Sequence, residues 1–240
     1  MKRSILILGG LMLAFNGFSQ TRVGGKVGLN YTIITTMVDP EPDEKPENGS
    51  GIGFHLGGYV QFGLSEMIGL RPELLFSARG FQESNTSTST YDVFGVTYTD
   101  ESKSDNKSSY NYLEIPVLLV LQPNDNIGLH IGPGFGLLMG GKVKSSGSTT
   151  TSYTSGGSTT TTTSDFDVEV SGSDVTDGLR KMELAVVIGG DYETDGGLNF
   201  GLRYWRGLNT VNEDTEFGDT TVKSFTNLIQ FSIGFSFIKG

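Results

Sequence analysis

The sequence predicts an all-β fold in which eight antiparallel strands, connected up and down, close into a barrel. Eight segments alternate apolar residues with small or polar ones, the period-two pattern of a strand with two different faces. Their connections alternate between long and short along the chain, and the composition is rich in glycine, with 35 residues. Transmembrane barrels of outer membranes have tight turns at one rim and long loops at the other. We therefore expect an eight-stranded transmembrane barrel with periplasmic turns and four extracellular loops.

The connections also carry most of the charge. The long ones span 35–51, 85–109, 142–176 and 209–226, and the short ones span 63–69, 123–126 and 194–197. The long connections hold 17 acidic and 6 basic residues, a net charge of −11 beside −10 for the whole chain. An even strand number places both termini at the periplasmic rim. Acidic loops repel nucleic acid, so we predict no nucleic-acid partner.

The N-terminus predicts export. Met1-Lys2-Arg3 is positive, residues 5–15 are mostly apolar, and Gly17-Phe18-Ser19 fits a cleavage site of small residues. This pattern is typical of a secretory signal peptide, so we predict a cleaved segment at 1–19 and a barrel domain at 20–240. The chain has no cysteine, which excludes disulfides, thiolate nucleophiles and cysteine metal ligands.

Each segment places bulky apolar residues on one face. In chain order these are Val23, Val27, Leu29 and Tyr31; Phe54, Leu56, Val60 and Phe62; Leu70, Leu74 and Phe76; Leu113, Ile115, Val117, Leu119 and Leu121; Ile127, Leu129, Ile131, Phe135 and Leu137; Met182, Leu184, Val186, Ile188 and Tyr192; Leu198, Phe200, Leu202 and Tyr204; and Ile229, Phe231, Ile233, Phe235 and Phe237. The opposite faces are small or polar, which suits a narrow lumen, so we expect the bulky faces to contact lipid. Aromatic residues toward the strand ends predict an interfacial girdle: Tyr31, Phe62, Phe76, Tyr112, Tyr192 and Tyr204.

Charged residues recur on the predicted inner faces. They are Lys26, Arg71, Glu73, Arg79, Glu114, Lys181, Glu183 and Arg203. An eight-stranded barrel is just wide enough for side chains to fill, and buried charges persist when they are paired. We expect a structural network of salt bridges that plugs the lumen. The alternative is the selectivity constriction of a narrow channel.

Candidates for chemistry are few. Glu73 and Glu114 lie on adjacent predicted strands and could pair as catalytic carboxylates, although nearby arginines make salt bridges the simpler interpretation. His55 and His130 face the lumen without a third metal ligand in view. We therefore predict no catalytic residues, no metal and no cofactor. An enzyme acting from the rim on lipids or peptides stays an alternative, as does a soluble lipocalin-like barrel, which the glycine-rich faces disfavour.

The long connections contain two kinds of sequence. The acidic, proline-rich stretch 39–47 predicts a solvated loop rather than a calcium site, and 145–164 is nearly all Ser, Thr and Gly, which predicts a mobile loop. Within them, 93–98 and 166–170 look like strands, so we expect two hairpins that rise above the membrane as a β-ribbon. Its edge could bind another chain by strand addition, or the ribbon could only hold the loops clear of surface polysaccharide. The candidate docking residues are Phe94, Val96, Tyr98, Tyr153 and Phe166.

Three motifs carry a family resemblance over residues 21–240: Gly25-Lys26-Val27-Gly28-Leu29-Asn30, Tyr112-Leu113-Glu114-Ile115-Pro116-Val117-Leu118-Leu119 and Gly201-Leu202-Arg203-Tyr204-Trp205-Arg206-Gly207-Leu208. With them the chain resembles the PorT-like small outer-membrane β-barrel proteins, common in Bacteroidota. The resemblance implies a Gram-negative outer membrane and allows an accessory role in protein secretion. The chain departs from the usual aromatic terminus of such barrels, because Ile238, Lys239 and Gly240 follow Phe237.

These observations favour a non-enzymatic role for the chain. We expect a monomeric outer-membrane protein that presents acidic, Ser/Thr-rich loops at the cell surface for binding, structure or secretion. The expected partners are outer-membrane lipid and lipopolysaccharide, the barrel assembly machinery, and a surface or secretion-system protein. The alternatives are a narrow porin-like channel for small solutes and a rim-acting enzyme.

Overall fold

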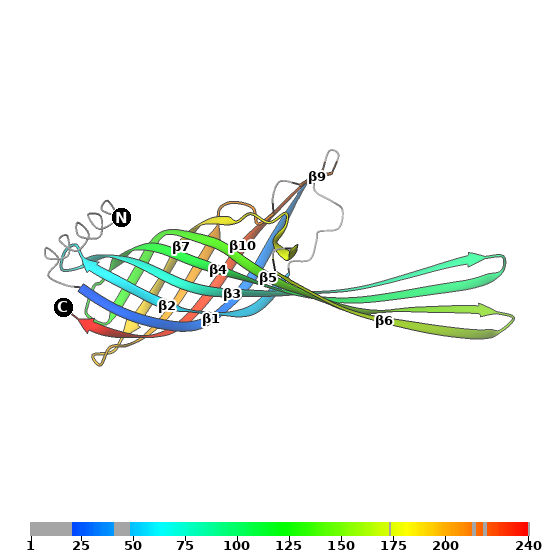
Figure 1. Ribbon diagram of the computed structural model, residues 1–240, viewed down its shortest axis with the longest axis horizontal. Helices are drawn as coiled ribbons and strands as arrows, with labels where there is room; N and C mark the ends of the chain where they lie inside the picture. The colour runs from blue at the N-terminus through cyan, green and yellow to red at the C-terminus, as the bar shows by residue number, and fades with distance from the viewer. Residues whose placement is uncertain (1–20, 41–48, 173, 213–214, 218–219, 240) are drawn as a thin grey trace.

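The computed structural model describes residues 21–40, 49–172, 174–212, 215–217 and 220–239 (Figure 1). The described elements, in chain order, are β1 (Thr21–Asp39), β2 (Ser50–Gly63), β3 (Ile68–Val93), β4 (Val96–Leu121), β5 (Ile127–Ser155), β6 (Ser158–Gly172), the 3-10 helix η2 (Asp174–Thr176), β7 (Met182–Glu193), β8 (Leu198–Gly207), β9 (Thr215–Phe217) and β10 (Thr220–Lys239). The predicted signal peptide and most of the acidic stretch 39–47 lie outside the described residues. In the described part of the chain, no helix is long and apolar enough to cross a membrane.

Eight of the strands close into a ring. The order is β1-β2-β3-β4-β5-β7-β8-β10, and β10 pairs back with β1. Every pairing in the ring is antiparallel, and each of these strands contains one of the eight predicted segments. Two strands lie outside the ring, since β6 pairs with β5 and β9 pairs with β10. The predicted eight-stranded antiparallel barrel is confirmed.

The two ends of the barrel differ. One end, here called the turn end, carries the connections 64–67, 122–126 and 194–197, together with the start of β1 and the end of β10. The other, the loop end, carries the long connections and the extensions of β3, β4, β5 and β6 (Figure 1). The alternation of short and long connections is therefore confirmed.

The outer wall of the barrel is apolar. The exposed fraction of Leu29 is 59% and that of Leu202 is 58%, while their chain neighbours Asn30 and Arg203 are buried in the lumen. This alternation matches the predicted faces and gives the wall a surface suited to lipid. Tyr112 is an exception to the predicted girdle, because it is only 4% exposed and its ring lies under the Arg79 guanidinium, 4.1 Å from ring centre to Cζ.

The lumen also contains an apolar layer beside its charged residues. Its members are fully buried or nearly so: Leu118, Val120, Ala185, Val187, Trp205 and Leu228. Glycine makes room for the largest of them, because a Cβ added at Gly134 would lie 2.6 Å from the Trp205 ring. In β4 this layer was hidden inside a continuous apolar run, where period two cannot be seen.

Beyond the barrel, β3, β4, β5 and β6 form a four-stranded sheet, which we call the ribbon (residues 81–109 and 142–172; Figure 1). Its β3–β4 hairpin turns at Phe94-Gly95, with φ of 50° and 80°, and its β5–β6 hairpin turns at Gly156-Gly157, with φ of 58° and 84°. Positive φ at both central residues is the two-residue turn that matches strand twist. The prediction that two hairpins form an extended β-ribbon is confirmed.

The prediction that residues 145–164 form a mobile loop is wrong. Residues up to Ser155 belong to β5, and β6 begins at Ser158. The physical reason is that threonine is β-branched and suits strands. In addition, β5 is paired on both sides, with β4 from Thr97–Thr154 onward and with β6 from Ser155–Ser158 onward.

Candidate functional site

The lumen holds two clusters of buried ion pairs. In the cluster nearer the turn end, the Glu73 carboxylate accepts a hydrogen bond from Lys26. It also accepts hydrogen bonds from Arg203 Nη1 and Nη2, at 2.8 and 3.0 Å. Beside it, Arg71 Nη1 donates to Asp191 Oδ1 at 2.7 Å, and the same carboxylate oxygen lies 3.2 Å from His130 Nδ1. These pairs join β1, β3, β5, β7 and β8 across the lumen.

The second cluster lies toward the loop end and centres on Arg79. Its Nε and Nη2 donate to Glu114 Oε1 at 3.1 and 2.8 Å, and its Nη1 donates to Glu183. Glu183 also accepts from the Trp205 indole at 3.0 Å, and Glu114 accepts from Gln230 at 3.1 Å. Every guanidinium nitrogen of Arg79 is therefore paired, and its charge faces two carboxylates.

One residue predicted for the lumen network lies outside it, and one member of the network was not predicted. Lys181 is exposed, and its ammonium donates to the carbonyl and hydroxyl of Thr176, at 3.0 and 2.8 Å, because β7 begins one residue after it. Asp191 was not among the predicted members of the network, and its carboxylate pairs with Arg71. The groups in these lumen pairs are then four basic and four acidic residues, with a formal charge of zero.

The two glutamates and His55, which the sequence offered for catalysis or metal binding, have other partners in the lumen. Glu73 and Glu114 belong to different clusters, each paired with its own arginine. His55 Nδ1 lies 2.7 Å from Asn30 Oδ1, and among the described residues no group of three or more His, Cys, Asp or Glu could hold a metal ion. The geometry fits a network that fixes side chains across the barrel.

The ribbon has one apolar face. A one-residue shift between the pairs Asn111–Gly140 and Tyr112–Leu138 makes Met139 an extra residue in β5, and this bulge aligns β5 with the faces of β3 and β4. By register, the side that continues the lumen face of the barrel carries the apolar residues of the ribbon. We call this side the apolar face. Its apolar members are Phe81, Tyr91, Val93, Val96, Tyr98, Val143, Tyr153, Phe166, Val168 and Val170, and the same register places polar residues between them, including Glu83, Asn85, Asp100, Ser104 and Asn106.

A row of tyrosines crosses this face near its tip. Tyr91 and Tyr98 stack with ring centres 5.4 Å apart and planes 8° apart, and Tyr98 lies 6.1 Å from Tyr153. Val96 and Phe166 share the face by register, whereas Phe94 lies in the turn at the tip and is fully exposed. The structure thus brings Val96, Tyr98 and Tyr153 together near the tip. Phe166 lies farther along the same face, because it is opposite Gly147, whereas Tyr153 is opposite Thr160.

Sequence reasoning missed Tyr91, Val93, Val168 and Val170. A two-residue turn at Phe94-Gly95 sets Val93 opposite Val96, and this register alone places Tyr91 opposite Tyr98. The sequence would therefore have indicated the pairing of Tyr91 with Tyr98 if the length of the turn had been known.

Comparisons with known proteins agree with the fold. The family described as outer membrane protein beta-barrel domain matches residues 18–213. No curated protein matches the chain. Three of the solved structures to which the chain is similar are described here. Ail, the attachment invasion locus protein of Yersinia pestis, is 12% identical, with 89% of this chain and 99% of that chain covered and a TM-score of 0.33.

The second is Neisserial surface protein A, also 12% identical, with 89% of this chain and 97% of that chain covered and a TM-score of 0.33. The third is the outer membrane protease OmpT from Escherichia coli, 9% identical, with 92% and 98% covered and a TM-score of 0.30. These values are too low to transfer a function. The family match, in contrast, covers most of the chain, and the chain therefore belongs to the outer membrane protein beta-barrel domain family.

Proposed function

We propose that the chain is a non-enzymatic surface protein of the outer membrane whose ribbon binds a protein partner through its apolar face. The observation that carries the proposal is the exposure of that face. Tyr91, Val93, Tyr153, Phe166, Val168 and Val170 are between 40% and 54% exposed. Apolar patches rimmed by polar residues mark interaction sites, and tyrosine is enriched in such interfaces.

The opposite face of the ribbon supports a binding role for one side only. By register it carries hydroxyl and charged side chains, including Lys142 and Lys144, which pair with Glu169 at 2.8 Å and Asp167 at 3.1 Å. A ribbon that served only as a spacer would have no need for one apolar side, because both faces would meet water. The amphipathic pattern therefore favours a partner over a spacer.

The barrel below favours the same role over a channel or an enzyme. Described side chains fill the lumen with neutralised ion pairs and a buried apolar layer. An eight-stranded barrel filled in this way offers no wide path for solutes. The carboxylates that could act as catalysts are held by arginines. We retain no second function.

The finer details of the proposal rest on the sequence. The signal peptide at 1–19 would export a monomeric, Gram-negative protein, and the turn end with both termini would face the periplasm. The loop end and the ribbon would then stand at the cell surface. The PorT-like motifs extend the proposal to a partner from a secretion system or from the cell surface.

The test is photo-crosslinking in living cells from two adjacent positions. A photoreactive amino acid replaces either Tyr153, on the apolar face, or Ser152, its neighbour on the polar face. We expect one defined protein to be crosslinked from position 153 and not from position 152. That crosslink should weaken when Tyr98→Ser and Phe166→Ser remove apolar side chains from the same face.

Equal capture from positions 152 and 153, or capture of lipopolysaccharide alone, would contradict the proposal. Planar bilayer recordings of the purified protein provide an independent check. We expect no conductance steps, and regular steps would instead support a channel.

A further inference from the structure

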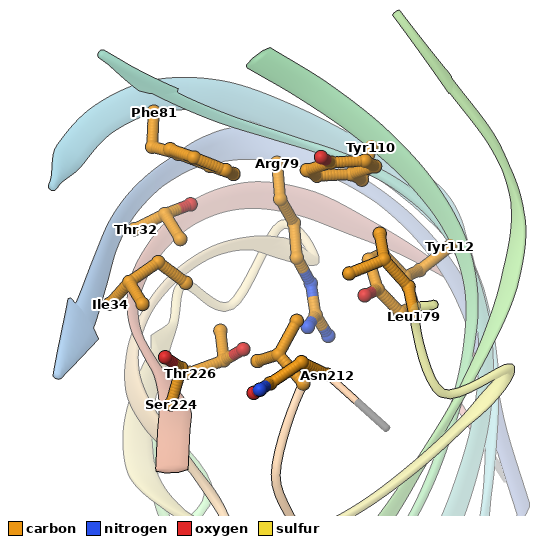
Figure 2. A pocket seen from close by; sticks show the side chains of 11 residues that line it. Thr32, Ile34, Arg79, Phe81, Tyr110, Tyr112, Leu179, Asn212, Ser224 and Thr226 are labelled. Carbon is orange, nitrogen blue, oxygen red and sulfur yellow. The ribbon is translucent and has the colours of Figure 1, made fainter. Parts of the chain in front are cut away.

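The mouth of the barrel at the loop end contains a partly open cavity of about 220 Å³ that the proposed function does not use. Phe81, Tyr110 and Tyr112 supply aromatic walls, and the side chain of Arg79 points into the centre (Figure 2). The Phe81 and Tyr110 rings stack with centres 5.5 Å apart. These walls come from β3 and β4 where the barrel passes into the ribbon, and residues of β1 and β10 form the opposite side.

Two loops roof the cavity. Leu179, after η2, forms an isolated antiparallel bridge with Asn212, after β8. Arg180 N donates to Val211 O at 2.8 Å, and Val211 N donates to Ser224 O at 2.8 Å. The backbone thus holds Leu179, Val211 and Asn212 over the mouth, where all three line the cavity.

The floor of the cavity disfavours anions. Arg79 is the basic residue of the lining, and its three nitrogens are already taken by Glu114 and Glu183. Two carboxylates around one guanidinium leave a negative balance there. A phosphate or carboxylate ligand would have to displace these buried pairs, at a large cost in free energy.

Two polar atoms of the lining are left for a ligand. Thr32 is 1% exposed, and its Oγ1 has no hydrogen-bond partner among the described residues. Asn212 Oδ1 is also buried and also has no hydrogen-bond partner in the part of the chain that the structure describes. A buried polar atom without a partner is costly, so a group that pairs with it is favoured. Thr32 can accept or donate, and the Asn212 oxygen can accept.

We propose that this cavity is a binding site for a neutral molecule of one aromatic ring that carries a hydroxyl or amino group. The size supports one ring, because an apolar cavity of about 150 Å³ holds benzene and drug-sized ligands need about 300 Å³ or more. The aromatic walls favour a flat ring by offset or edge contacts. The polar substituent satisfies Thr32 or Asn212.

The test measures binding of 4-fluorophenol to the purified full-length protein in detergent micelles by fluorine NMR. Fluorobenzene and 4-fluorobenzoate are the comparison probes. We expect saturable binding of 4-fluorophenol, weaker binding of fluorobenzene and none of 4-fluorobenzoate. Thr32→Val should weaken 4-fluorophenol binding by about 3- to 10-fold, the contribution of one hydrogen bond, and leave fluorobenzene binding unchanged.

Cavity-filling variants distinguish the site from partition into micelles. Leu179→Trp and Val211→Trp fill the cavity from different loops and should abolish saturable binding of both probes. Leu208→Trp is the matched control, since Leu208 is 58% exposed and does not line the cavity. Heat-dependent gel migration reports whether each barrel is folded. Saturable binding that persists in either folded Trp variant, or its absence from the unaltered protein, would overturn the proposal.

Discussion

The barrel and the ribbon share β3, β4 and β5 but turn their apolar residues to opposite sides. In β3, Phe76 lies on the outer wall, whereas Phe81, five residues later, lies on the side that continues the lumen. An odd step along a strand changes the face. Because only lipid favours an apolar outer face, we expect the border between lipid and water around residues 77–80 of β3.

A second difference concerns the lumen side. In the barrel, this side is closed by paired charges and a buried apolar layer. In the ribbon, the same side carries tyrosines and valines that stay exposed. The barrel is thus complete as a folded unit, whereas the exposed side of the ribbon is where we propose that a partner binds. Substitutions in the barrel and in the ribbon test this contrast.

Removal of Arg79 should produce the largest loss of stability. Arg79→Met leaves the carboxylates of Glu114 and Glu183 buried without their cation, at a cost of about 3–5 kcal/mol in the free energy of unfolding. Lys181→Met is the control, because Lys181 is exposed, and it should change stability by about 0.5 kcal/mol or less. Urea unfolding in lipid vesicles measures both. Equal effects of the two substitutions would contradict the lumen network.

A charge added to the two apolar surfaces should have different effects. Leu202, in the middle of β8, is 58% exposed on the barrel wall, and Val168 is 54% exposed on the ribbon. Leu202→Lys should cost about 2–4 kcal/mol because the ammonium enters lipid. Val168→Lys should cost about 0.5 kcal/mol or less, because its site meets water.

The same urea unfolding in vesicles compares these two variants. A large loss of stability in Val168→Lys would indicate that the ribbon also lies in lipid. That result would contradict the difference in environment between the barrel wall and the ribbon.

Two glycines of β5 differ in the space available for a side chain. A Cβ at Gly134 would lie 2.6 Å from the fully buried Trp205 ring, whereas a Cβ at Gly140 would have nothing within 4 Å. Gly134→Ala should therefore destabilise the barrel by about 1–3 kcal/mol through overpacking. Gly140→Ala should not destabilise it, since alanine also restricts the unfolded chain. Tryptophan fluorescence during unfolding reports on the single Trp205 directly, and similar curves for both variants would argue against the tight contact.

The sequence could predict the barrel because lipid imposes a simple rule on the wall. Leu29 and Leu202 face outward by period two alone, and the short turns and long connections give the strand order. The apolar lumen layer could not be predicted, because Leu118 and Val120 lie in an unbroken apolar run. Contacts across the lumen, such as Arg71 with Asp191, depend on barrel closure and stagger, which the sequence does not reveal.

The ribbon could be predicted from the sequence only in part. Its existence was predictable from 93–98 and 166–170, but its full length was not, because the Ser/Thr-rich composition is shared by mobile loops. Pairing with β4 decides between these states, and such pairing joins residues as distant as Tyr98 and Tyr153. The apolar face follows from the turn at Phe94-Gly95 and the bulge at Met139, two features of the backbone rather than of composition.

The smallest predicted effect concerns the tyrosine row at the tip of the ribbon. Tyr91 Oη donates to Asp100 Oδ2 at 3.1 Å, and this hydrogen bond, together with partial desolvation and the aspartate charge, raises the pKa of Tyr91 above its ordinary value of 10.0. A raised pKa means that the folded ribbon favours the protonated phenol. The contact therefore stabilises the ribbon below pH 10 and loses its effect as the pH rises through the raised pKa.

Asp100→Ala should return the pKa of Tyr91 toward 10.0, whereas Asp92→Ala, next to Tyr91 in sequence but bonded to Thr97, should leave it raised. An NMR titration of protein with labelled tyrosine rings, assigned with Tyr91→Phe, measures the shift. If both aspartate variants lowered the pKa equally, the stacked and hydrogen-bonded geometry of the row would be contradicted. A shift confined to Asp100→Ala would support a tip that holds its tyrosines in a fixed arrangement before a partner arrives, which reduces the entropy cost of binding.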